Sequence, residues 1–110
     1  MRKGKDKLQG TLEMLVLRVL ASSSRLHGCE ISDRIQEISA EALHVEEGSL
    51  YPALHRMEEA GWVKSEWRNS DNNRRARYYR ITPRGRRRVD DVQRDWLEHV
   101  DAVTRVLKHA

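Results

Sequence analysis

The segment GSLYPALHRMEEAGWV, residues 48–63, has the signals of one short helix. Ser49 can cap the N-terminus and Pro52 is tolerated only in the first turn, so the helix is predicted to begin near Gly48 to Ser49. Gly61 lies where a glycine commonly ends a helix, because glycine adopts the left-handed backbone conformation without steric cost. The segment therefore predicts a helix that ends just before Gly61.

This helix is predicted to have one buried and one exposed face. The buried face is formed by apolar residues at helical spacing, Leu50, Ala53, Leu54 and Met57. The opposite face presents small or hydrogen-bonding side chains near the positive helix end, namely Ser49, Tyr51, Pro52, His55 and Arg56. Such a face suits a phosphate-lined groove, although a solvated surface has the same composition. Glu58 and Glu59 oppose full-length contact with DNA, so we expect only the first half to reach bases.

The residues after this helix predict two antiparallel strands joined by a polar loop. Apolar or small side chains alternate with charged ones over residues 63–68, and the alternation returns over residues 78–81. Asparagines and an aspartate in residues 69–73 tolerate the positive backbone torsions of a loop tip. The returning side carries an expected basic wing that clamps phosphates or enters a minor groove, made of Asn73, Arg74, Arg75 and Arg77.

Two adjacent tyrosines follow the wing. One of Tyr78 and Tyr79 is expected to pack behind the hairpin while the other could reach a phosphate, but cross-strand aromatic packing is the safer expectation for both. Tyr79 is therefore left out of the expected DNA-binding residues.

Positive charge is concentrated around this hairpin. Residues 64–88 contain ten Lys and Arg against two acidic residues, a net charge of +8, so the rest of the chain carries −4 of the overall +4. A chain that is mildly acidic elsewhere and strongly basic in one stretch has the electrostatic pattern of a protein that binds a polyanion. Double-stranded DNA is the leading partner, and an anionic membrane surface is a distant second.

Upstream, the sequence predicts two further helices. In GTLEMLVLRVLASSS, residues 10–24, Thr11 is expected as the N-cap of an apolar helix that the serines end. Met14 and Leu17 fall outside the main apolar stripe of this helix and make it apolar nearly all round. Either one of its faces therefore meets a partner subunit, or the helix is wholly internal to one chain. HGCEISDRIQEIS, residues 27–39, has isoleucines at helical spacing and predicts a short amphipathic helix that Gly28 separates from the preceding loop.

Residues 82–110 predict a long final helix. Thr82 as N-cap and Pro83 at the first position are a strong start signal. Valines and one tryptophan then recur at intervals of three or four on an otherwise charged helix, a narrow stripe more typical of a coiled-coil seam than of a core-facing surface. The expected dimerisation residues are Leu17, Val89, Val92, Trp96, Val100, Val103 and Val106.

The composition limits other possibilities. With 110 residues we expect one compact unit, divided into a winged helix-turn-helix region, residues 1–81, and a dimerisation helix, residues 82–110. No apolar run approaches the roughly 20 residues of a membrane span and no signal peptide is recognisable, so a cytoplasmic location is expected. The single cysteine, Cys29, excludes an internal disulfide. No nucleophile stands with a base and an acid in a known motif, so we expect no enzyme, cofactor or metal.

The order of three helices, a hairpin and a long helix predicts a mainly α fold, a winged helix-turn-helix with N-terminal and C-terminal dimerisation helices. The chain also resembles PadR-family transcriptional regulators over essentially its whole length. The matching stretches are LQGTLEMLVLRVL, HGCEI, EEGSLYPALHRMEEAGWV, NNRRARYYRITPRGRRRV and the valine-rich end. The short final helix is similar to that of the compact PadR subgroup.

This resemblance implies a bacterial repressor that binds an inverted-repeat operator as a homodimer, with the third helix and the wing on DNA and the first and last helices in the dimer. A small hydrophobic or aromatic effector could bind beside Met14 and Trp96, where Trp96 could equally fill the interface. The chain departs from the family at Cys29, where an aromatic residue is common, and this cysteine could provide a thiol switch.

Two alternatives belong to other functional classes. The scaffold could be a protein interaction module whose arginines hold an acidic partner, and failure to bind any duplex DNA would favour this function. Cys29 with His27 could form a redox or metal sensor, although two ligands lack the further donors that tetrahedral zinc requires.

Overall fold

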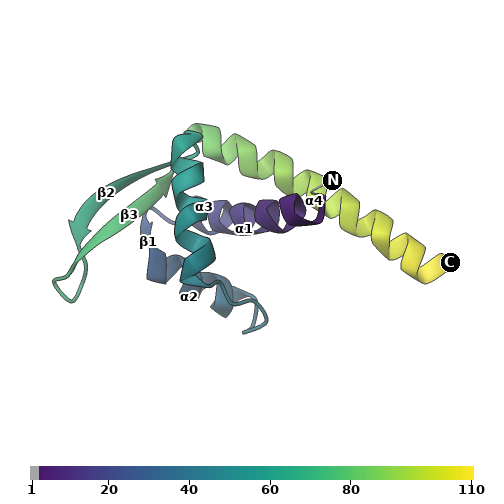
Figure 1. Ribbon diagram of the computed structural model, residues 1–110, viewed down its shortest axis with the longest axis horizontal. Helices are drawn as coiled ribbons and strands as arrows, with labels where there is room; N and C mark the ends of the chain where they lie inside the picture. Colours follow the sequence, from purple (N-terminus) through teal and green to yellow (C-terminus); the bar gives the residue numbers. More distant parts are fainter. Residues whose placement is uncertain (1–2) are drawn as a thin grey trace.

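The computed structural model describes residues 3–110, with side chains described from Gly10 onward. Over this range the chain forms four helices and one three-stranded antiparallel sheet (Figure 1). The elements in chain order are α1 (Lys3–Ala21), β1 (Leu26–His27), α2 (Gly28–Ile38), α3 (Glu47–Glu59), β2 (Val63–Asn69), β3 (Arg75–Ile81) and α4 (Pro83–His109). This order confirms the predicted winged helix-turn-helix with a long final helix.

Two elements project in opposite directions from a central body (Figure 1). The hairpin of β2 and β3 extends on one side and the second half of α4 on the other, so the molecule measures 56 × 29 × 26 Å. The strand order is β1-β3-β2, and the short β1 places Leu26 opposite Tyr79. The sequence did not predict β1, because two residues are too few to show a periodicity.

The hydrophobic core surrounds α1, which contacts all three other helices and β3. The largest fully buried side chains come from every layer, and they are Leu17, Leu20, Ile31, Leu50, Leu54, Met57, Val16, Val63 and Val89. The expectation that Leu17 forms part of the dimer interface is wrong, because its side chain is 1% exposed in the core of the protomer. With neighbours on several sides, α1 needs apolar residues nearly all round, and Met14 is buried for the same reason.

The N-terminus of α1 differs from its prediction. Thr11 is not the N-cap, because the helix already begins at Lys3 and includes Gly10. A threonine caps a helix only where the preceding chain is extended, and a single glycine lowers helix stability by about 1 kcal/mol without ending the helix. The helix ends at Ala21, just before the serines that were expected to end it.

The second helix starts with Gly28 as its first residue rather than as part of a loop. Its N-cap is His27, whose Nδ1 accepts a hydrogen bond from the Glu30 amide at 3.4 Å while the Glu30 carboxylate accepts one from the His27 amide at 3.0 Å. This reciprocal pair is a capping box with histidine in the place usually taken by Ser or Thr. Ile31 and Ile35 are buried as predicted, whereas Ile38, the last residue of the helix, is 70% exposed.

The third helix begins earlier than predicted. Its N-cap is Glu46, whose carbonyl accepts hydrogen bonds from the amides of Ser49 and Leu50, so Ser49 is not the cap. Pro52 lies in the second turn, where its missing N–H costs only the bond to the carbonyl of Gly48 at an exposed helix start. The predicted C-terminus is confirmed, since Gly61 has a φ of 82°.

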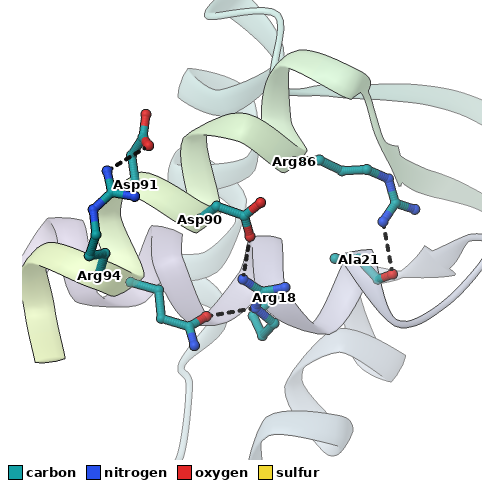
Figure 2. Close-up of polar contacts among 7 residues, drawn as sticks. Arg18, Ala21, Arg86, Asp90, Asp91 and Arg94 are labelled. Atoms are coloured by element: carbon teal, nitrogen blue, oxygen red, sulfur yellow. Dashed lines mark hydrogen bonds and ion pairs between the residues drawn. The ribbon is translucent and has the colours of Figure 1, made fainter.

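Helix α4 begins as predicted, with the Thr82 hydroxyl accepting a hydrogen bond from the Gly85 amide at 3.0 Å. Its first half is fixed to α1 by polar contacts (Figure 2). The Arg18 guanidinium donates to the Asp90 carboxylate at 2.9 Å and to the Gln93 side chain at 2.8 Å, and Arg86 donates to the carbonyl of Ala21 at 3.3 Å. None of the helices within residues 3–110 combines the length and the apolar character that crossing a membrane requires.

The apolar stripe of α4 is divided between two environments. Val89 is fully buried and Val92 packs against the core, so the expectation that they form a seam between subunits is wrong for Val89. The reason is that α1 covers the first half of α4. The rest of the stripe is partly exposed, at 37% for Trp96, 39% for Val100, 43% for Val103 and 64% for Val106.

Candidate nucleic-acid interface

The exposed face of α3 carries part of the set of side chains that the sequence assigned to DNA, while the predicted set Leu50, Ala53, Leu54 and Met57 is buried. Ser49, Pro52 and His55 are exposed, and His55 lies 3.5 Å from the Glu59 carboxylate one turn later. A carboxylate at this distance offsets positive charge on the second half of the helix. The first half of α3 is therefore the part best suited to a polyanion.

Tyr51 lies toward α2. The Tyr51 hydroxyl lies directly against Gly28 of α2, since a Cβ added at Gly28 would be only 2.4 Å from the hydroxyl oxygen. Tyr51 is nevertheless 42% exposed. Burial raises the pKa of the Tyr51 hydroxyl, and the nearby Cys29 thiol and Glu47 carboxylate raise it further. The hydroxyl is therefore neutral at pH 7 and can both donate and accept a hydrogen bond at the edge of the exposed face.

Arg56 lies on the other flank of α3, toward α1. Its Nε donates to the Glu13 carboxylate at 3.4 Å, and the Glu13 side chain is only 16% exposed. The predicted DNA-facing residues thus do not share one face. Pro52 and His55 are exposed to solvent, whereas Tyr51 packs against α2 and Arg56 is paired with Glu13 of α1.

The hairpin has the predicted strands and loop. Trp67 pairs with Arg77 and Asn69 pairs with Arg75, so residues 70–74 form the tip. Asn73 has a φ of 61°, the left-handed conformation that asparagine tolerates, and its amide donates to the carbonyl of Ser70 at 2.9 Å. The tip presents Asn73 and Arg74 to solvent, and Arg75 at the start of β3 is exposed as well.

Trp67 organises the arginines on one face of the hairpin. Its ring is 53% exposed and lies 5.6 Å from the Arg75 guanidinium carbon and 5.4 Å from that of Arg77. Stacking of guanidinium groups on an indole is favourable and orders long side chains. Sequence reasoning placed Trp67 on a strand but missed this role, which the alternation of the two strands could have indicated once the register was known.

Arg77 is held more firmly than a free cationic arm. Its Nε donates to the Ser65 hydroxyl at 2.9 Å, and its Nη2 lies 3.7 Å from the Glu58 carboxylate. The contact with Glu58 links the wing to the end of α3. Glu58 was expected only to keep the second half of α3 away from DNA, so this internal use of its charge was missed.

The adjacent tyrosines face opposite sides of β3. Tyr78 makes a cross-strand aromatic contact with His27 of β1, with ring centroids 5.2 Å apart in an edge-on arrangement. Tyr79 is 6% exposed and has Leu26 and Ser65 as its cross-strand partners, so the expected aromatic pairing is wrong for this residue. Burial raises the pKa of Tyr79, while the neighbouring Arg77 acts in the opposite direction.

A groove of about 920 Å³ joins these parts. Its walls come from the start of α2, from α3 and from the hairpin, including Cys29, Tyr51, Trp67, Arg75 and Arg77. Tyr51 of α3 and Arg75 of the wing, which are more than twenty positions apart in sequence, therefore border the same open space. A surface with hydrogen-bonding groups on one wall and guanidinium groups on the other has the chemistry that a nucleic-acid backbone requires.

Met14 and Trp96, which the sequence proposed as an effector site, border one pocket. Together with Gly10, Thr11, Val92, Asp95 and His99 they line a space of about 190 Å³ between α1 and α4. The Trp96 and His99 rings lie 6.1 Å apart.

Cys29 is a free, exposed thiol at the start of α2. Across residues 3–110, the His, Cys, Asp and Glu side chains whose positions are described form no group of three or more that could hold a metal ion.

The chain matches the transcriptional regulator PadR-like family over residues 16–91, which span the end of α1, then β1, α2, α3, the hairpin and the first part of α4. A protein of Mycobacterium tuberculosis named as a transcriptional regulator is 39% identical over 74 residues, 67% of this chain and 65% of that protein.

Solved structures give the same result. A transcriptional regulator from Clostridium thermocellum has a TM-score of 0.80 at 28% identity and covers 91% of this chain and 96% of its own. A PadR family transcriptional regulator from Eggerthella lenta has a TM-score of 0.75 at 29% identity, with coverage of 98% and 92%. Members of this family regulate transcription and are not enzymes, which confirms the expectation that the chain has no catalytic function. The chain belongs to the PadR-like family of transcriptional regulators.

Proposed function

We propose that the protein is a homodimeric repressor that binds an inverted-repeat operator. The first half of α3 enters the major groove, and the exposed arginines of the wing contact the sugar-phosphate backbone. The observation that carries this proposal is the shared groove of about 920 Å³, which has Tyr51 on one side and the wing arginines Arg74 and Arg75 on the other. Helix-turn-helix proteins bind DNA through the N-terminal part of the recognition helix, which fits the division of charge along α3.

Each half of the proposed dimer reads one half-site. Two recognition helices related by a two-fold axis meet successive major grooves when their half-sites are about one helical turn, roughly 34 Å, apart. The exposed stripe on the second half of α4 supplies the apolar surface for the two-fold contact, with Trp96, Val100, Val103 and Val106. Apolar side chains at three- and four-residue intervals on a charged helix are the pattern of helices that pair.

The pocket beside Met14 and Trp96 supports a place for a small hydrophobic or aromatic effector. It lies between α1 and the start of the exposed stripe, so a ligand bound there acts where the proposed dimer is formed. Such a ligand releases DNA only if it binds more tightly to a dimer whose recognition helices are wrongly spaced. Alternatively, side chains of the partner subunit fill this pocket in the dimer. Trp96 then packs in the dimer interface and binds no effector.

Selection of bound fragments from random duplex DNA tests the proposal directly. We expect enriched sequences to contain an inverted repeat with half-sites one helical turn apart. Binding to the selected duplex should weaken with salt by about 0.9 log units per phosphate neutralised per log unit of salt. Light scattering should report a dimer at micromolar concentration. A protein that retards no duplex DNA, or a monomer, would contradict this function, and the first result would favour the protein interaction module.

A double substitution on α3 tests the face that contacts bases. Tyr51→Ala with Arg56→Ala should remove the preference for the selected operator over random DNA while the thermal unfolding transition is retained. Arg94→Ala is the matched control, because it removes an exposed guanidinium from α4, far from the groove, where it is paired with Asp91. Unchanged selectivity of the α3 variant would show that another face of the protein reads the sequence.

A further inference from the structure

The junction between α3 and the hairpin contains an internal counter-charge. Glu58 near the end of α3 accepts a hydrogen bond from the Ser65 hydroxyl of β2 at 2.6 Å. Ser65 in turn accepts one from Nε of Arg77 on β3 at 2.9 Å, and Nη2 of Arg77 lies 3.7 Å from the same carboxylate oxygen of Glu58. Three elements thus meet at one carboxylate, which holds one guanidinium of the wing.

The surroundings make this hold effective. The Glu58 side chain is 33% exposed and that of Arg77 is 40% exposed, so water only partly screens the pair. The Trp67 ring packs against the guanidinium, 5.4 Å from its central carbon. Charge, hydrogen bonding and stacking therefore all favour the inward position of Arg77.

The neighbouring wing arginines differ from Arg77. Over the described residues Arg75 contacts the Trp67 ring but makes no ion pair, and Arg74 makes none either. All three belong to the same basic stretch and line the same groove. Of Arg74, Arg75 and Arg77, only Arg77 is described with an ion pair to a carboxylate of the protein.

We propose that Glu58 limits sequence-independent DNA binding by holding Arg77 away from the phosphates. A guanidinium that is paired with an internal carboxylate releases few counterions when DNA approaches, so it adds little to the salt-dependent part of the affinity. Glu58 is a positioning residue that acts through Arg77, and the Ser65 hydroxyl is the bridge between them. This inference rests on the proposed function, because it concerns the strength of DNA binding.

Glu58→Gln tests the proposal, because glutamine keeps the shape of the side chain and removes its charge. Binding to a random-sequence duplex is measured by fluorescence anisotropy over a series of salt concentrations. We expect the slope of log Kd against log salt to become steeper by about 0.9, and the affinity at 0.1 M salt to rise roughly eightfold, the effect of one additional phosphate contact. A slope equal to that of the wild type would overturn the inference.

Two further variants show whether the effect passes through Arg77. Adding Arg77→Gln to Glu58→Gln should cancel the gain in slope; a gain that persists means that Glu58 merely repels DNA, and the inference is overturned. Arg75→Gln is the matched control, because it removes an uncompensated cation and should make the slope shallower by about 0.9. A change of this size in Arg75→Gln shows that the assay detects a single cation.

A variant without a charge change guards against misfolding of Glu58→Gln. Ser65→Ala removes the hydroxyl that bridges Glu58 and Arg77, and it should steepen the slope in the same direction while thermal unfolding remains cooperative. If both folded variants bind as the wild type does, the inference fails and the proposed function stands. If the wild type binds no duplex at all, both the proposed function and this inference are wrong.

Discussion

The two halves of α4 have the same apolar spacing but different surroundings. In the first half, α1 and the hairpin cover the stripe, and Val89 has no exposed surface. In the second half the helix extends past the body (Figure 1), and Val106 is 64% exposed. The comparison shows that periodicity identifies which side chains of a helix share a face, whereas the length of the neighbouring elements decides which of them become core.

The polar contacts follow the same division. Arg18, Asp90 and Gln93 join α1 to the first half of α4, whereas Arg94 and Arg105 on the second half form ion pairs within the helix. Such exposed pairs within one helix contribute only a few tenths of a kcal/mol each. A long helix with so little support gains stability mainly by burying its apolar face, and a second copy of the chain is the partner that we propose for it.

The largest effect should come from charges placed on the second half. Val100→Glu with Val103→Glu is expected to convert the proposed dimer fully to monomer, because dimerisation would bury unpaired carboxylates. Ala102→Glu with His109→Glu adds the same side chains away from the stripe and should leave the dimer intact. Sedimentation velocity at micromolar concentration distinguishes these results, and a dimeric Val100→Glu, Val103→Glu protein would place the interface elsewhere.

The next largest effect should come from the start of the first half. A Cβ added at Gly85 would lie 2.1 Å from the carbonyl oxygen of Trp62, a backbone atom that cannot move freely. Gly85→Ala should therefore lower the free energy of unfolding by about 3 kcal/mol, near the upper end for overpacking. Gly10→Ala is the control, since a Cβ there has no atom within 4 Å. Equal stability of the two variants in urea denaturation would contradict the tight contact between α4 and the hairpin.

A pair of identical substitutions compares the two halves directly. In the monomeric Val100→Glu, Val103→Glu background, Val89→Ala should cost about 2 kcal/mol of unfolding free energy, because it leaves a cavity in the core. Val106→Ala in the same background should change that free energy by less than about 0.5 kcal/mol, as is usual for exposed positions. Urea denaturation measures both values, and similar costs would mean that the second half is also packed against the protomer.

An effect smaller than that of Val89→Ala is expected at the cap of α4. The Thr82 hydroxyl accepts from the Gly85 amide and donates toward the carbonyl of Gly61 at 2.7 Å, so it joins the helix start to the end of α3. Thr82→Ala should lower the free energy of unfolding by about 1 kcal/mol, the usual cost of losing an N-cap. Thr82→Ser keeps the hydroxyl and should restore most of the loss. A Thr82→Ala protein as stable as the wild type would mean that solvent replaces these bonds.

Much of the fold was predictable from local patterns. The signals at Thr82, Pro83 and Gly61 specify a helix start and a helix end through the conformations of single residues, and the strand alternation gave the hairpin. The errors at Thr11 and Ser49 arose because a residue able to cap a helix does so only where the preceding chain leaves the helical conformation. The residue type alone does not show whether the chain before it is helical.

The candidate site was predictable as a list but not as an arrangement. The sequence placed the residues expected to face DNA on α3 and the basic residues on the wing, yet it did not distinguish Arg77 from Arg75. That difference depends on Glu58, which is nineteen positions away in sequence and reaches Arg77 only across the packed junction of α3 and β2. Contacts between distant segments are set by the packing of whole elements, which no local pattern contains.

By itself the sequence determined the order of helices and strands, the buried face of α3 and the concentration of positive charge around the hairpin, because backbone preference, apolar spacing and charge are properties of neighbouring residues. Only the tertiary structure decided that Leu17 and Val89 are core, that the stripe of α4 becomes exposed from Trp96 onward, and that Arg77 is held by Glu58. These outcomes depend on how far each element extends beside another, a quantity that exists only when the chain is folded.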